Sequence, residues 1–140
     1  SLPKELAECS ELKSLDLSKN KLDSLGAVIL QLQKLEVLHL SKNQFEEIPK
    51  LLGKLPQLRE LHLDQNPLDS LKADINEWRS LETLDLWDCE IKFVRRELCQ
   101  NETLQHLDLR RNFLGTRDLD WLINCLAGAD VLSTWGCDCD

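Results

Sequence analysis

The stretch Leu12-Lys-Ser-Leu15-Asp-Leu17-Ser-Lys-Asn20-Lys-Leu22 decides the fold, because the chain repeats its pattern at a constant spacing. The leucine that opens the stretch recurs every 23 residues, at Leu35, Leu58, Leu81 and Leu104. Each recurrence opens the same phrase, LxxLxLxxNxL, in which Cys89 once replaces the asparagine. A sustained period of this length indicates a solenoid of stacked coils.

Each copy also specifies its own local structure. Alternating leucines such as Leu15 and Leu17 point to one side of a short strand, and the residues between them point to the other. The later spacing of three, as in Leu52, Leu55 and Leu58, suits a turn or two of helix over the same interior. Because one coil cannot bury its leucines alone, the coils must stack with their strands in parallel. The sequence therefore predicts an α/β solenoid with a concave parallel β-sheet and short convex helices.

The five copies, with the convex segment Ile48-Pro49-x-x-Leu52-x-x-Leu55, resemble the leucine-rich-repeat family and its 23-residue, Ras-suppressor-like subclass. The resemblance implies a right-handed horseshoe segment that recognises other proteins, as in signalling scaffolds, innate immune receptors and bacterial adhesins. We expect one domain over residues 1–140: a partial repeat at 1–11, five repeats at about 12–116 and a C-terminal cap at about 117–140. A capping helix is predicted from Asp118 to Leu126, and a degenerate strand at 129–134.

Several polar and sulfur-bearing residues have structural explanations. The repeat asparagines are expected to hydrogen-bond backbone groups of the neighbouring coil, and Cys89 is expected to be a buried thiol in the same position. Inward-facing repeat positions place Cys9, Trp78 and Trp121 in the core. Asn101 opens a glycosylation triplet but takes an inward position, so we discount glycosylation there.

The other cysteines leave their pairing open. Cys99 and Cys125 lie on adjacent convex segments, so a disulfide between them is one alternative. Cys137 and Cys139 can bridge elsewhere, bind a metal or lie in a disordered tail, and the tail is the preferred interpretation. Six cysteines and no methionine slightly favour an exported protein over a cytoplasmic one, although a piece of a longer chain fits equally.

Composition limits the classes of function. The chain has 140 residues and a net charge of −8, and no apolar stretch approaches the length of a membrane span. The negative charge argues against nucleic acid and anionic membranes as partners. The five glycines are scattered and no nucleophile elbow occurs, so we predict that the chain is not an enzyme. We expect a monomer that binds another protein and needs no cofactor.

The residues that alternate with the leucines form columns on the concave face, because equivalent positions of successive coils stack about 5 Å apart. Trp87 stands in a column of otherwise small or polar residues and is predicted to be an exposed binding hot spot. The other predicted partner-binding residues surround it: Glu60, Asp64, Asp85, Asp88, His39 and His62. We expect the partner to place a basic or mixed patch and an apolar group against Trp87. The alternative is that Trp87 packs on its neighbours and the charges form a solvated surface.

His39 and His62 are adjacent in the central column and are flanked by aspartates. Two such imidazoles can share a zinc ion, with Asp85, Asp64 or Glu60 as a third ligand. The opposing interpretation is an ordinary ladder of polar side chains, since no HxxH or CxxC motif supports a metal site. A further class of function is a structural spacer or docking segment of a larger protein, which the incomplete first repeat permits.

Overall fold

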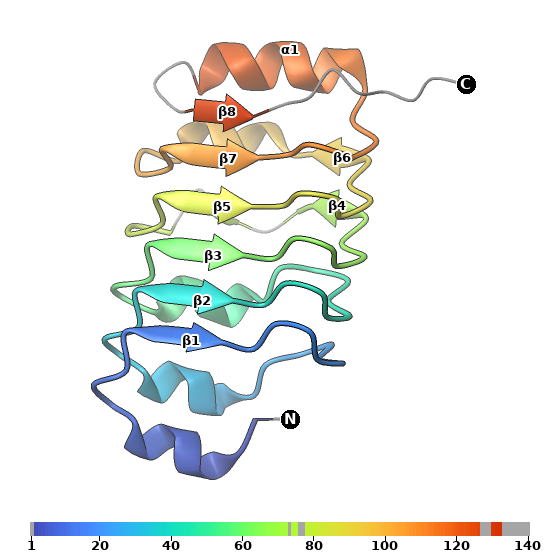
Figure 1. Ribbon diagram of the computed structural model, residues 1–140. Helices are drawn as coiled ribbons and strands as arrows, with labels where there is room; N and C mark the ends of the chain where they lie inside the picture. The colour runs from blue at the N-terminus through green and yellow to red at the C-terminus, as the bar shows by residue number, and fades with distance from the viewer. Residues whose placement is uncertain (1, 73, 76–77, 127–129, 133–140) are drawn as a thin grey trace.

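The computed structural model describes residues 2–72, 74–75, 78–126 and 130–132. Its main element is a 6-stranded parallel sheet that runs the length of the stack (Figure 1). The strands follow one another in the order β1 (Ser14–Asp16), β2 (Val37–His39), β3 (Glu60–His62), β5 (Thr83–Asp85), β7 (His106–Asp108) and β8 (Asp130–Leu132). The first five strands pair in the register of the repeat, as Leu38 does with Leu61 and Leu61 with Leu84. The spacing of the last pairing is one residue longer, with His106 opposite Asp130.

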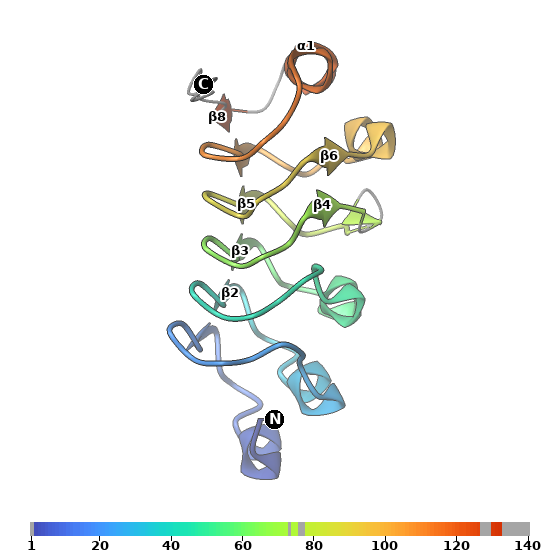
Figure 2. The ribbon, with the colours of Figure 1, turned by 90° about the vertical axis from the view of Figure 1, so that its right-hand side faces the viewer.

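Short helices cover the opposite side of the solenoid. They are 3-10 helices of 5 residues each: η1 (Lys4–Glu8), η2 (Ala27–Gln31), η3 (Lys50–Lys54) and η5 (Arg96–Gln100). Such short 3-10 segments commonly serve as connectors, and here each leads the chain to its next strand. Figure 2 shows the helices fanned farther apart than the strands, so the sheet is the concave face and the helices form the convex face. The predicted α/β solenoid is therefore confirmed.

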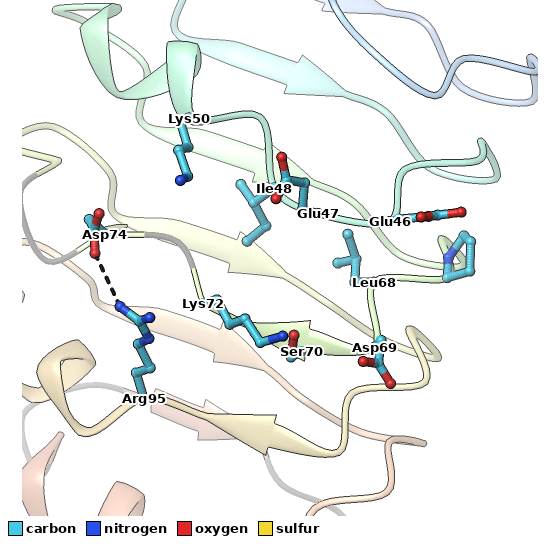
Figure 3. A pocket seen from close by; sticks show the side chains of 11 residues that line it. Glu46, Glu47, Ile48, Lys50, Leu68, Asp69, Ser70, Lys72, Asp74 and Arg95 are labelled. Atoms are coloured by element: carbon cyan, nitrogen blue, oxygen red, sulfur yellow. Dashed lines mark ion pairs between the residues drawn. The ribbon is translucent and has the colours of Figure 1, made fainter.

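A second parallel sheet, of 2 strands, lies on the flank where the chain passes from the concave to the convex side. Its strands are β4 (Ser70–Leu71) and β6 (Phe93–Val94). Beside β4 lies a hollow of about 430 Å³, bordered by the segment 46–50 of the preceding coil (Figure 3). Charged side chains of both signs line this hollow, and Arg95 pairs with Asp74 across it at 3.7 Å. The mixture of charges selects no class of ligand.

Burial depends on whether a coil has neighbours on both sides. The leucines of internal strands are 0% exposed: Leu38, Leu61, Leu84 and Leu107. Leu15 and Leu17 of the first strand are only half-buried. Cys9 is exposed, so the prediction of an interior thiol is wrong. The equivalent Leu32 is enclosed by coils above and below, whereas Cys9 lies in the outermost described coil.

A turn in the left-handed backbone region follows each of the first five strands of the main sheet. The residue before each repeat asparagine or Cys89 has a φ between 54° and 58°: Lys19, Lys42, Gln65, Asp88 and Arg111. This region costs a non-glycine residue about 1–2 kcal/mol. The asparagine then holds the turn: Asn66 Nδ2 donates to the carbonyls of Leu40 at 3.0 Å and Leu63 at 2.8 Å, and its Oδ1 accepts the N–H of Phe45 at 3.1 Å. The predicted bonding to a neighbouring coil is confirmed for Asn43, Asn66 and Asn112, whereas Asn20 bonds only to carbonyls of its own coil.

Three other predictions about buried positions are also confirmed. Cys89 is buried with its Sγ 3.2 Å from the carbonyl of Leu63, and burial raises the pKa of its thiol to about 12. Trp78 is a core residue. Asn101 is buried and donates to the carbonyl of Ile75 at 2.6 Å, so its amide faces the interior rather than a glycan-accessible surface.

The C-terminal cap contains α1 (Thr116–Cys125), a helix of 10 residues that begins and ends slightly earlier than predicted. No helix among the described residues is long and apolar enough to cross a bilayer. A disulfide joins Cys125 to Cys99 of η5, with a Cα–Cα distance of 5.4 Å, and ties α1 to the convex face. β8 falls inside the predicted strand at 129–134, and Cys137 and Cys139 lie outside the described residues.

Trp121 of α1 is only half-buried, so its assignment to the core is wrong. Its indole N–H donates to Asp118 at 3.2 Å, and the guanidinium of Arg96 lies 5.8 Å from its ring centroid. The ring lies at the edge of the core, between α1 and η5, where its polar N–H can reach a partner.

Asn66→Ala is expected to lower the free energy of unfolding by about 1–3 kcal/mol, because it leaves the buried Phe45 N–H without a partner. The carbonyls of Leu40 and Leu63 keep Asn43 and Cys89 as donors. Asn20→Ala is the matched control. Asn20 is exposed and bonds only to carbonyls of its own coil, so a change within about 0.5 kcal/mol is expected. Urea unfolding followed by circular dichroism measures both, and equal losses would contradict the cross-coil role.

The Cys99→Ser, Cys125→Ser double variant is expected to lose about 3 kcal/mol of stability, because a loop with a sequence separation of 26 is no longer closed in the unfolded chain. Cys9→Ser, which removes an exposed free thiol, serves as the control and is expected to unfold like the wild type. Denaturant unfolding of both variants, and a peptide map of the unreduced wild type, give the measurement. Free thiols at both positions in that map would show that the bridge does not form.

Candidate protein-binding face

The strand register builds the concave face column by column. It places His39 between Asp16 and His62, and it places His62 next to Asp85. Glu60 lies in the adjoining column, two residues before His62 on the same strand. The remaining predicted binding residues follow the strand ends in the turn: Asp64, Trp87 and Asp88. The structure thus brings the predicted set together on one part of the sheet, from β2 to β5.

His62 is the most highly connected side chain of this face. Its imidazole stacks on that of His39, with ring centroids 4.5 Å apart and an interplanar angle of 14°. Its Nδ1 lies 3.6 Å from Asp85 Oδ2 and its Nε2 lies 3.7 Å from Glu60 Oε2, both longer than ordinary hydrogen bonds. The carboxylate of Asp85, and then that of Glu60, raise the pKa of His62 above its ordinary value against the opposing effect of burial.

Asp85 serves both the face and its own turn. Its Oδ1 accepts the N–H of Trp87 at 3.0 Å. Burial alone would raise the pKa of Asp85, but the His62 imidazole and the Trp87 N–H together hold it below its ordinary value. Asp16 and Asp108 accept the N–H two residues further on in the same way, at 2.8 and 3.0 Å. An aspartate in the central column therefore caps the turn that follows its strand.

Asp64 and Asp88 hold the next two positions of the face. Asp64 accepts the hydroxyl of Ser41 from the preceding coil in a short hydrogen bond. Asp88 accepts from the Gln65 amide at 3.5 Å. Both partners are neutral, so neither hydrogen bond is an ion pair.

Trp87 is half-buried, so its indole is less exposed than the sequence predicted. The guanidinium of Arg111 lies 5.2 Å from its ring centroid in a cation–π arrangement. Arg111 comes from the next coil, one residue beyond the position equivalent to Trp87. Its role was missed in the sequence because the left-handed turn that aims it is a backbone property.

The geometry does not assemble a zinc site from His39 and His62. Among the described residues, no three His, Cys, Asp or Glu side chains gather in a way that could hold a metal ion. The lone pairs of an imidazole lie in its ring plane, and in a stacked pair those planes run side by side rather than converging on one ion. The hydroxyl of Ser41, two residues after His39, donates to Asp64.

An ion-pair ladder along the rim of the sheet was also missed. One repeat position reads Lys13, Glu36, Arg59 and Glu82 in successive coils. Lys13 pairs with Glu36 at 2.9 Å and Arg59 pairs with Glu82 at 2.8 Å. The sequence contains the pattern that predicts these ion pairs, because the sign of the charge at this position alternates from one repeat to the next. Because its charge is paired, Glu82 contributes less to the acidic surface than its position suggests.

Comparison with known proteins agrees with this geometry. The sequence pattern of the family described as "Leucine rich repeat" matches residues 10–68, and a second pattern of the same description matches residues 103–125. The chain belongs to the leucine-rich-repeat family. No curated protein sequence matches this leucine-rich-repeat chain significantly.

Solved structures share the fold over nearly the whole chain. A leucine-rich-repeat protein of Leptospira interrogans is 28% identical, with a TM-score of 0.83. The match covers 94% of this chain and 34% of the Leptospira chain. The PEPR1–AtPEP1 complex contains a chain that is 30% identical with a TM-score of 0.69, over 94% of this chain and 19% of its own. Internalin C2 of Listeria monocytogenes shares the fold, with 22% identity and a TM-score of 0.71, over 95% of this chain and 55% of its own. Leucine-rich-repeat proteins are typically non-enzymatic modules of protein recognition.

Proposed function

We propose that this leucine-rich-repeat chain acts as a monomer that binds a segment of another protein on its concave face, between β2 and β5. The partner segment presents a lysine or arginine next to an apolar side chain. The observation that carries the proposal is a group of four carboxylates on neighbouring coils beside one half-buried tryptophan, Trp87. Asp64 takes the equivalent position of the preceding coil, Asp85 and Asp88 lie within two residues of Trp87, and Glu60 lies farther along the same face, opposite Thr83.

The carboxylates of this group are available to a cationic partner. In the described part of the chain, none of the four forms an ion pair with lysine or arginine, in contrast to Asp108, which Arg110 holds at 2.6 Å. His62 lies beside two of them, Glu60 and Asp85. Negative charge on a concave, partly desolvated surface attracts cationic groups more strongly than the same charge on an open surface.

Trp87 supplies the apolar half of the site. Tryptophan is enriched among the side chains that carry most of the binding energy in protein interfaces. Arg111 shows that the indole face accepts a guanidinium, so an arginine of the partner finds the same chemistry there. The complex of PEPR1 with AtPEP1, which contains a chain of similar fold, supports recognition of a partner by this architecture.

The test is selection from a random peptide library against the immobilised chain. We expect enrichment of peptides that combine lysine or arginine with an aromatic or aliphatic residue, with affinity that falls as salt screens the charges. The triple variant Asp64→Asn, Asp88→Asn, Trp87→Ala is expected to weaken the selected peptides by about tenfold or more, measured by calorimetry.

A triple variant on another surface gives the matched control. Glu46→Gln, Glu47→Gln, Phe113→Ala removes the same number of charges and one aromatic ring from exposed positions outside the concave face. It is expected to bind like the wild type. Equal losses in the two variants, or peptides without cationic residues, would refute the concave site. A library that yields no binder would favour a spacer role.

A further inference from the structure

We propose that His62 makes the concave face proton-sensitive, so that a proton on its imidazole competes with the cationic group of a partner for Glu60 and Asp85. The inference concerns the regulation of the site described above and rests on the proposed function for its link to binding. The protonation behaviour itself does not depend on any partner.

The positions of the two ring nitrogens carry the argument. Nδ1 faces Asp85 at 3.6 Å and Nε2 faces Glu60 at 3.7 Å. A neutral imidazole has one N–H and one lone pair, so it must direct that lone pair towards one of the two carboxylates. The imidazolium directs an N–H towards each carboxylate. The arrangement therefore suits the protonated ring. When the proton is lost, the negative charges of the two carboxylates are no longer balanced by a positive charge on His62.

Two arginines act electrostatically on the carboxylates beside His62, but each forms its ion pair elsewhere. Arg59 acts on Glu60 and pairs with Glu82 at 2.8 Å. The charged and titratable groups that face it are His39 from β2, Glu60 and Asp64 from β3, and Asp85 from β5. Arg110 acts on Asp85 from beyond β7 but pairs with Asp108 instead. His62 is thus the titratable cation that lies between Glu60 and Asp85.

The stacked partner leaves both ring nitrogens of His62 to the carboxylates. His39 contacts His62 ring face to ring face, with centroids 4.5 Å apart, and does not lie between either nitrogen and its carboxylate. The charge that His62 gains therefore lies between the two carboxylates that a partner would use.

The direction of the effect follows from the raised pKa of His62, caused first by Asp85 and then by Glu60. The proton stabilises the fold below the ordinary value of 6.5, and this stabilisation disappears as the pH rises through the raised pKa. A cationic partner experiences the opposite trend, because it binds better once the proton has left. One linked proton changes affinity by at most about tenfold for each pH unit.

The deciding experiment is an NMR titration of the three histidine side chains in the unliganded chain between about pH 5 and pH 9, with assignments from His62→Gln and His39→Gln. We expect His62 to titrate above 6.5 and the Asp85→Asn and Glu60→Gln variants each to lower its midpoint. Asp69→Asn is the charge-matched control, since Asp69 pairs with Lys92 outside the concave face, and it is expected to leave the midpoint in place. Titration of His62 at or below 6.5, or an equal shift in the control, would overturn the proposal.

A second measurement tests the link to binding. A cationic peptide selected on the concave face is expected to bind more weakly at about pH 6 than at pH 8, with a dependence that His62→Gln abolishes. A pH-independent affinity at the same face would show that the proton and the partner do not compete. If no peptide recognises the face, the proposed function fails, while the NMR titration still decides whether His62 is the proton-sensitive group.

Discussion

The structure depends on the way one coil satisfies the buried backbone of the next. Asn66 shows the arrangement completely, because its side chain bonds to two coils at once while the residue before it holds a left-handed turn. A buried amide or carbonyl without a partner is costly, so neighbouring coils cannot slip relative to one another. Cys89 keeps the same position with a thiol, and there Asn112 of the following coil accepts both the Cys89 and Ile91 N–H groups. This constraint fixes the 23-residue register throughout the internal coils.

A fixed register turns sequence positions into surface columns. Any side chain then meets its equivalent 23 residues further on, which is why alternating charges at the rim become ion pairs and adjacent histidines become a stack. Each coil thus contributes one residue to each column of the concave face. A binding surface can be altered by changing residues in a single column, without any change to the core.

The two ends of the stack follow different rules. At the first coil, leucines that would be sealed elsewhere stay half-buried, and Cys9 is exposed at the position where Leu32 is enclosed. At the C-terminal end, α1 covers the last described coils and the Cys99–Cys125 disulfide holds it there. Period-based prediction assigned Cys9 and Trp121 to the core because it treats every coil as an internal one.

The sequence by itself determined the fold, the strand register and the membership of the concave face. These follow from the alternation of leucines and the constant period, which restrict the backbone whatever the surface residues are. Only the tertiary structure decided that Arg111 covers Trp87, that His62 presents both nitrogens to carboxylates, and that Cys99 pairs with Cys125. Side-chain directions and pairings depend on which neighbours compete for the same space and charge. That competition exists only once the coils are stacked.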